Sequence, residues 1–372
     1  MTGRPIHVLV VGQTPPPFGG QAVMIQAMLE GHYQGVVLHH VRMAFSEDME
    51  SVGRFQPRKL WVLFTTVLNV WRARIIHRTP VLYYPPSGPN KVPVLRDLIL
   101  LGAVRWMFRR TVFHFHASGV SGFAPQLPAV LRPLFRLAYG RPDLAIRTAQ
   151  QNPDDGAMLE ARRSIVVPNG VQDARGTVAE RTAGPDEPLV ILFTGVLIAS
   201  KGVMVLLEAF RRLREQGVNA HLELMGKWGD ASFQAHCEHF VARHGLADRV
   251  RFLGVKRDAE KLAHFAGCDI FCFPSHFEAE SFGLVLAEAM QFAKPVVSTR
   301  WRGIPSVVEE GVNGFLVPVE DPGAVADRLA RLSADPALRA SMGEAGRRIF
   351  EQRFTLERFH RRMEEAFLSL RP

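Results

Sequence analysis

The chain has 372 residues, of which 47% are hydrophobic and 22% are charged, with a formal net charge of +9. The length suits two domains, and the composition argues against disordered and fibrous proteins. Three cysteines (Cys237, Cys268 and Cys272) are too few for a disulfide framework and indicate a reducing compartment. We expect no secretory signal at the start and no membrane-spanning helix, and therefore a cytoplasmic protein.

The positive charge lies in the first half of the chain. Residues 1–176 contain 20 Lys or Arg against 10 Asp or Glu, hence +10, whereas residues 177–372 contain 25 against 26, hence −1. A basic half can face nucleic acid, an anionic membrane or anionic substrates, and charge alone does not choose among them.

Short apolar runs alternate with helical stretches through the first half. The first run, Ile6–Val11, predicts a buried strand, and the Pro- and Gly-rich loop 15–20 then precedes a helix near Ala22–Glu30. Further strands are predicted at Val81–Tyr84, Thr111–Phe115, Leu144–Ile146 and Ser164–Val167. This alternation is typical of a parallel sheet flanked by helices.

Residues 59–78 and 94–110 are apolar, with tryptophans and clustered arginines. One interpretation is a pair of core helices of the first domain with solvated ends. The other is a basic, aromatic-edged surface that lies on an anionic membrane, at the inner membrane face, which would suit a lipid-linked acceptor.

A polar stretch, Thr177–Pro188, predicts a linker, after which the alternation restarts. Strands are predicted at Leu189–Thr194, His221–Met225, Val250–Leu253, Asp269–Phe273 and Pro295–Ser298, and helices at Val203–Glu215, Leu284–Gln291 and Phe354–Leu370. We therefore predict two doubly wound α/β domains, at residues 1–176 and 189–353. Ligands of such sheets bind at the carboxyl ends of the strands, so the loops there are the candidate site.

Two glutamates mark the most informative loop. Glu280 follows a predicted strand, and Glu288 comes eight positions later in a helical run. The amides of Ser281–Leu284 at the helix start would form an anion site. Alternatively, both carboxylates are solvated on a helix face.

Three other loops could carry chemistry. Lys201–Gly202 precedes a helix, where a lysine can neutralise a diphosphate or can simply be exposed. Gly19–Gly20 let a backbone approach a ligand, or form only a turn. His114 and His116 share one strand face, and no third metal ligand of suitable spacing is near; His114 is interpreted as structural, and His116 lies at the strand end.

Together these segments resemble the retaining glycosyltransferases of family 4, which have the GT-B fold of two Rossmann-like domains facing a central cleft. The matching motifs follow the family's order along nearly the whole chain: Gly19–Gly20, FHASG with His116, PNG at 168–170, Lys201–Gly202, FLG at 252–254, and ESFG within E-x₇-E at 280–288.

The resemblance implies that Glu280 and His116 are catalytic, both beside the donor sugar. It implies that Lys201 binds the diphosphate and Glu288 the ribose hydroxyls. It also implies that the final segment, 354–372, packs on the first domain. The remaining donor-binding residues that it implies are Gly19, Gly20, Gly195, Gly254, Val255, Ser281, Phe282, Gly283 and Leu284.

The resemblance further implies transfer of a hexose from a nucleotide diphosphate sugar to a glycan or lipid-linked acceptor, in polysaccharide or glycolipid synthesis. No Asp-x-Asp motif occurs, so we expect no metal and no cofactor besides the donor. Val196 stands where many family members have an arginine that binds the diphosphate. Lys201 then works alone, or Arg300 or Arg302 replaces that arginine.

Three competing functions have less support. A nucleotide-sugar epimerase of the same fold would release the sugar instead of transferring it. A nucleic-acid-binding protein is disfavoured because no base-reading module occurs, so we expect no nucleic acid partner. A nicotinamide dehydrogenase is disfavoured because the spaced glycine fingerprint is missing.

Overall fold

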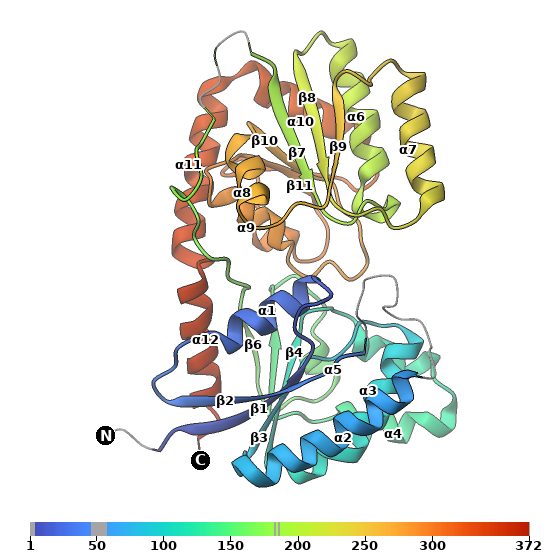
Figure 1. Cartoon of the computed structure of the whole chain (residues 1–372), viewed down its shortest axis with the longest axis vertical. Helices are drawn as coiled ribbons and strands as arrows, with labels where there is room; N and C mark the ends of the chain where they lie inside the picture. The colour runs from blue at the N-terminus through green and yellow to red at the C-terminus, as the bar shows by residue number, and fades with distance from the viewer. Residues whose placement is uncertain (1–3, 46–57, 182–183, 185–186, 372) are drawn as a thin grey trace. The chain divides into compact units, whose positions relative to one another are not determined.

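The computed structural model describes residues 4–45, 58–181, 184 and 187–371; four positions of the predicted linker, 182–183 and 185–186, lie outside the described residues. The chain divides into two compact units, an N-terminal unit of Met1–Gly170 with Leu356–Pro372 and a C-terminal unit of Val171–Thr355. Both units are drawn in Figure 1. The chain thus passes between units at residues 170/171 and 355/356, where the boundaries predicted from the sequence were 176/177 and 353/354.

The N-terminal unit contains a six-stranded parallel sheet of order β2-β1-β3-β4-β5-β6. Its strands are β1 (Ile6–Gly12), β2 (Val36–Arg42), β3 (Val81–Tyr84), β4 (Arg110–Phe115), β5 (Leu144–Arg147) and β6 (Ser164–Val166). Its helices are α1 (Gly20–Leu29), α2 (Arg58–His77), α3 (Lys91–Val104), α4 (Arg132–Tyr139), α5 (Asp155–Met158) and α12 (Leu356–Leu368), with short 3₁₀ turns at Arg105–Met107, Val120–Gln126 and Ala129–Leu131.

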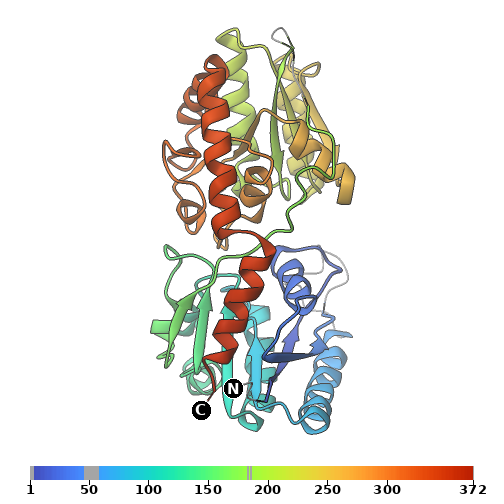
Figure 2. The same cartoon turned by 90° about the vertical axis from the view of Figure 1, so that its left-hand side faces the viewer.

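Helices cover both faces of this sheet, as alternation along β3 requires. The ring of Tyr83 lies 6.0 Å from that of Phe367 on α12, whereas the hydroxyl of its neighbour Tyr84 donates to Asp97 on α3, 2.7 Å away. Figure 2 shows α12, the red helix at the end of the chain, lying against the sheet of this unit.

The helix α12 is tied to the N-terminal unit by apolar and polar contacts. Phe359, Met363 and Phe367 are buried. The Glu364 carboxylate accepts hydrogen bonds from the backbone N–H groups of residues 34 and 35, both at 2.7 Å. These contacts close the β2 side of the unit with a segment that follows the whole C-terminal unit in sequence.

The C-terminal unit contains a second six-stranded parallel sheet, of order β12-β11-β10-β7-β8-β9. Its strands are β7 (Leu189–Thr194), β8 (Ala220–Met225), β9 (Val250–Gly254), β10 (Ile270–Phe273), β11 (Val296–Thr299) and β12 (Gly314–Val317). Its helices are α6 (Val203–Glu215), α7 (Ala231–Arg243), α8 (Asp258–Gly267), α9 (Leu284–Met290), α10 (Pro322–Ala334) and α11 (Pro336–Arg353), with 3₁₀ turns at Ala199–Lys201 and Ile304–Ser306.

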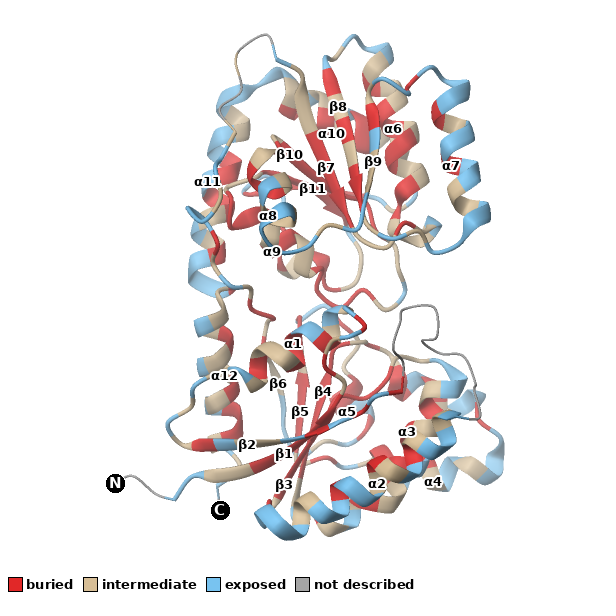
Figure 3. Ribbon diagram, in the orientation of Figure 1, coloured by how far each residue is buried: buried red, intermediate tan, exposed pale blue. Residues whose placement is uncertain are grey.

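The core of each unit lies in its sheet. Strands β3, β10 and β11 are buried along their whole length, and Figure 3 shows buried residues concentrated in the strands and on the inner sides of the helices. Cys237, Cys268 and Cys272 are free and buried, and burial raises the pKa of Cys237 and Cys268 to about 12. These thiols are therefore packing residues.

The prediction of α/β architecture is confirmed, but two strands were missed and one helix was predicted too long. Both missed strands lie at sheet edges: β2 has polar histidines in its middle, and β12 has only four residues. The segment 94–110 is not a single helix, because α3 ends at Val104, a 3₁₀ turn follows and β4 begins at Arg110.

Candidate functional site

A close backbone contact in the C-terminal unit brings the loop after β7 against the loop after β10. Gly202 has φ +80°, and a Cβ there would lie 2.1 Å from the carbonyl oxygen of Pro274. Only glycine permits both the left-handed conformation and this approach. The contact places Lys201, at the end of its 3₁₀ turn, beside the loop that carries Glu280.

Lys201 and Glu280 form a largely buried ion pair. The Lys201 Nζ lies 2.6 Å from Glu280 Oε2, and the side chains are 16% and 9% exposed. The ammonium also lies 4.6 Å from the ring centre of Phe277 and 5.3 Å from that of Phe273, while the Ser275 hydroxyl donates to the same carboxylate oxygen at 3.1 Å. Lys201 is therefore not the exposed lysine of the alternative interpretation, and both charged groups of this pair are largely shielded from solvent.

The segment after Glu280 turns sharply into α9. Ser281 and Phe282 are buried, and Gly283 has φ +77° and precedes the first helical residue, Leu284. The Phe282 ring packs edge-on against Phe354, at 5.4 Å between ring centres. The turn therefore belongs to the core on one side, and the proposed role of its amides stays a prediction.

Glu288, on α9, pairs with a residue that the sequence did not suggest. Lys261 Nζ, on α8, lies 2.6 Å from Glu288 Oε1, with side chains 28% and 19% exposed. The other oxygen, Oε2, is buried and accepts no hydrogen bond from the residues that the structure describes. The alternative in which Glu280 and Glu288 are solvated helix-face carboxylates is wrong, because both are shielded and ion-paired.

Buried polar atoms without a hydrogen-bond partner gather at the same edge. Among the described residues of this unit they include Thr194 Oγ1 at the end of β7, His276 Nδ1 after β10, Arg302 Nε after β11 and Glu288 Oε2. Native proteins leave few such groups, and each needs an explanation such as a ligand or water. Two further such atoms among the described residues of this unit, His221 Nδ1 and Gln291 Nε2, lie elsewhere. Four of the six thus lie at the end of a strand or on a segment that follows one, which indicates a binding site at the carboxyl edge of the sheet.

Glycines also bring the loops after β7, β8 and β9 together. A Cβ on Gly226 would lie 1.7 Å from the carbonyl oxygen of Gly195, and the Gly226 N–H donates to the Gly254 carbonyl at 2.9 Å. Val255, next along, is 54% exposed. Gly195, Gly254 and Val255 thus lie on adjoining loops at the edge that carries Lys201.

In the N-terminal unit, the rings of His114 and His116 are in contact at the carboxyl end of β4, with centres 3.9 Å apart and planes tilted by 33°. The Tyr83 hydroxyl lies 2.8 Å from His114 Nδ1 and 3.4 Å from His116 Nε2. Burial lowers the pKa of His116 to about 3; burial, and then the neighbouring His116, lower that of His114 well below its usual value. Both imidazoles are therefore neutral near pH 7.

The loop after His116 is held by a buried carboxylate that sequence reasoning missed. Asp155 accepts hydrogen bonds from the N–H groups of Gly119 and Ser121, both at 2.8 Å, and from the Ser121 hydroxyl. Burial raises the pKa of Asp155 despite these donors. No spacing in the sequence links residues so far apart, so only the fold reveals this partner.

The glycine pair of the N-terminal unit lies at a helix start, as its position before a helical stretch predicted. Gly19 is the N-cap of α1, and Gly20 is the first residue of the helix. The preceding loop is held by Arg42, whose guanidinium donates to the carbonyls of Thr14 and Pro16 at 3.3 and 2.9 Å. Gly19, Gly20 and His116 are all near carboxyl ends of strands of this unit.

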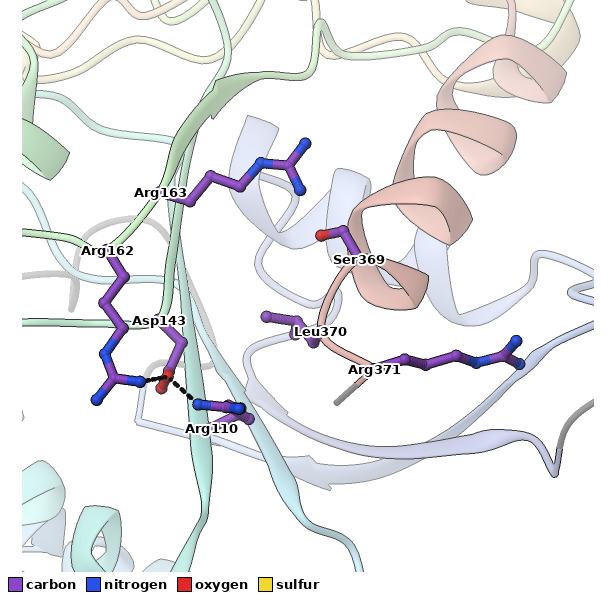
Figure 4. Close-up of a pocket in the computed structure, with 7 residues that line it drawn as sticks. All are labelled: Arg110, Asp143, Arg162, Arg163, Ser369, Leu370 and Arg371. Atoms are coloured by element: carbon purple, nitrogen blue, oxygen red, sulfur yellow. Dashed lines mark hydrogen bonds and ion pairs between the residues drawn. The ribbon is translucent and has the colours of Figure 1, made fainter.

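A pocket of about 170 Å³ lies at the opposite, amino ends of strands β4 to β6 (Figure 4). The guanidinium groups of Arg110 and Arg162 converge on Asp143, at 3.0 and 3.3 Å, while that of Arg371 points away. None of the residues predicted to bind a ligand lines this pocket.

Comparisons with known proteins agree with this architecture. Residues 176–349 match the family model of glycosyl transferases group 1. The chain is 32% identical over 238 residues to a phosphatidyl-myo-inositol mannosyltransferase of Mycobacterium leprae, covering 62% of this chain and 60% of the relative. It is 35% identical over 197 residues to a D-inositol 3-phosphate glycosyltransferase of Corynebacterium efficiens, covering 52% and 46%. The chain thus spans about half the length of the curated relatives it matches.

Among solved structures, Anabaena Alr3699/HepE in complex with UDP and glucose superposes with a TM-score of 0.72 at 20% identity, over 98% of this chain and 100% of that one. Two parallel α/β sheets arranged in this order define the GT-B fold of glycosyltransferases. The match of residues 176–349 and these relatives confirm the resemblance to group 1 glycosyltransferases that the motifs indicated.

Proposed function

We propose that this chain is a retaining hexosyltransferase, which transfers a sugar from a nucleotide diphosphate sugar to a glycan or lipid-linked acceptor in polysaccharide or glycolipid synthesis. One observation carries the proposal: the shielded Lys201–Glu280 pair at the carboxyl edge of β7 and β10, 2.6 Å apart. A cation and a carboxylate in contact can bind, side by side, a diphosphate and a sugar hydroxyl.

In this proposal the ion pair breaks when the donor binds, and each of the two side chains then contacts a different part of the donor. Phosphate oxygens take over the Lys201 ammonium, and the freed Glu280 carboxylate accepts a hydrogen bond from the sugar. The sugar–phosphate bond then breaks through an oxocarbenium-like state, while Lys201 and the amides of Phe282, Gly283 and Leu284 stabilise the leaving diphosphate. The acceptor attacks from the same face and gives its proton to the departing phosphate, which retains the configuration. No metal or other cofactor takes part.

Two further residues have roles in this proposal. The buried Oε2 of Glu288 lacks a donor among the described residues, and ribose hydroxyls would supply one. His116, whose pKa burial lowers to about 3, acts as a neutral hydrogen-bonding group toward the sugar and not as a cation.

Thermal-shift screening against UDP-, GDP- and ADP-sugars identifies the donor, because a ligand that binds the folded state stabilises it. With that donor, K201A and E280A should each lower the turnover about a hundredfold, whereas E215A, at an exposed position on α6, should leave it unchanged. NMR of the product should show the donor's anomeric configuration. Near-normal turnover in both variants would refute the roles of the pair, and sugar release without acceptor would favour the epimerase.

We further propose that α2 contacts an anionic membrane. Its large apolar side chains face solvent at helical spacing, with exposures from 38% to 67%: Leu60, Trp61, Phe64, Leu68, Trp71, Ile75 and Ile76. The helix has no acidic residue, and it begins with Arg58 and Lys59 and ends near Arg72 and Arg74. A solvent-facing apolar stripe flanked by cations matches a lipid surface. In the described part of the chain, no helix is both long and apolar enough to cross a membrane.

Co-sedimentation with phosphatidylglycerol and phosphatidylcholine vesicles tests this surface. We expect binding to the anionic vesicles only, weakened about tenfold in W61S/F64S and unchanged in V312S, an exposed valine of the other unit. Equal binding by W61S/F64S would refute the proposal, as would a wild-type protein that self-associates through α2 and ignores vesicles.

A further inference from the structure

Two arginines follow β11, at the edge where the Lys201–Glu280 pair lies. The loop that carries them is joined to the loop after β10: the Trp301 indole N–H donates to the Phe277 carbonyl at 2.8 Å, and the Ser298 hydroxyl to the Phe273 carbonyl at 2.5 Å. The ring of Phe277 in turn lies 4.6 Å from the Lys201 ammonium. Trp301 thus links the loop that carries the arginines to the backbone of Phe277, whose ring lies beside the Lys201 ammonium.

The two guanidinium groups have different surroundings. Arg300 is 60% exposed, and its Nη2 lies 3.9 Å from Glu310 Oε2. Arg302 stacks on Trp301, with its Cζ 5.3 Å from the ring centre. Its Nε is buried and finds no acceptor among the residues that the structure describes. A buried charged donor without a partner costs free energy unless an anion reaches it.

The backbone of Arg302 adds a second cost. Its φ of +47° lies in the left-handed region, which is unfavourable for a residue with a Cβ. Such conformations cluster at functional sites, where the side chain is needed in a particular place. Glycine would avoid this strain and make the protein more stable. The presence of arginine therefore indicates that its side chain has a role.

We propose that Arg302 is the second cation of the diphosphate site and supplies the charge that is absent at Val196. The inference rests on the proposed function. Stacking on Trp301 fixes the plane of the guanidinium, and its buried Nε–H and outer N–H groups form a fork that suits two oxygens of one phosphate. Arg300, already paired with Glu310, is not required.

Isothermal titration of wild type, R302Q, R302K, R302G and R300Q with UDP, GDP and ADP, and with the matching monophosphate, tests the inference. R302Q should weaken diphosphate binding about tenfold and monophosphate binding less than twofold, because only the outer phosphate loses its partner. R302K should recover part of the affinity. R300Q, the same charge change two positions away, should stay within twofold of wild type.

The R302G variant separates binding from folding. It should bind the diphosphate as weakly as R302Q and yet unfold at a higher temperature than wild type, because glycine relieves the left-handed strain. Unchanged diphosphate affinity in R302Q, or equal losses for the mono- and diphosphate, would overturn the inference alone. A wild-type protein that binds none of the three diphosphates would overturn the proposed function with it.

Discussion

Removing either member of the Lys201–Glu280 pair should destabilise the C-terminal unit, and the two substitutions should have different costs. At 2.6 Å, two unit charges attract by about 6 kcal/mol at an effective permittivity of about 20, and desolvation of the shielded side chains offsets much of this. We expect a net coupling of about 2–3 kcal/mol. K201A should cost more than E280A. Among the described residues, the carboxylate left by K201A keeps the Ser275 hydroxyl as its one remaining side-chain donor, whereas the ammonium left by E280A keeps two aromatic rings.

A double-mutant cycle of wild type, K201A, E280A and K201A/E280A measures this coupling. Hydrogen exchange of β7 and β10 amides at increasing urea is the suitable assay, because a chain of two units need not unfold in one step. The pair Lys261–Glu288 is the matched comparison: its N–O distance is also 2.6 Å, but its side chains are 28% and 19% exposed, so its coupling should be smaller. A Lys201–Glu280 coupling below about 0.5 kcal/mol, or a larger loss in E280A than in K201A, would refute the reasoning.

Two other predictions concern stability. G202A should lower the free energy of unfolding by at least about 3 kcal/mol, because φ is +80° and the new Cβ would lie 2.1 Å from the carbonyl oxygen of Pro274. G217A, at φ +81° with nothing within 4 Å of the new Cβ, should lower it by about 1 kcal/mol. Chemical denaturation compares the two variants, and equal losses would show that the backbone clash is absent. Acidification should destabilise the N-terminal unit, because the lowered pKa values of His114 and His116 (about 3 for the latter) mean that the unfolded chain binds more protons below pH 6.5. The stability contributed by His116 should fall from about pH 6.5 toward pH 3 by up to about 1.4 kcal/mol per pH unit, and H116N should reduce the slope seen in urea titrations.

Local pattern was sufficient for the central strands and for the edge strands β6 and β9, but not for the edge strands β2 and β12. Central parallel strands are buried on both faces, so β3 and β10 read as continuous apolar runs. The edge strand β2 contains His39 and His40, and its middle is half-exposed, so its strand signal is weak. Its pairing with β1 supplies the stability that its composition does not show.

The sequence likewise identified some residues of the candidate site and not others. Motif order along the chain singled out Lys201, Glu280 and Glu288, and the C-terminal unit places all three at one edge of its sheet. Lys261 and Asp155 were not identified from the sequence, because their partners lie on other elements, 27 and more than 30 positions away along the chain. Contacts of that kind follow from how helices pack on a sheet, which spacing in one dimension does not encode.

The placement of α12 constrains the order in which the protein can be completed during synthesis. Residues 356–371 are synthesised after the whole C-terminal unit, yet Phe359, Met363 and Phe367 are buried in the unit whose sheet precedes it. Until then the nascent N-terminal sheet leaves the Tyr83 side of β3 uncovered, while the C-terminal unit already has all its strands. Chaperone demand should therefore fall on the first half of the chain until α12 has been made.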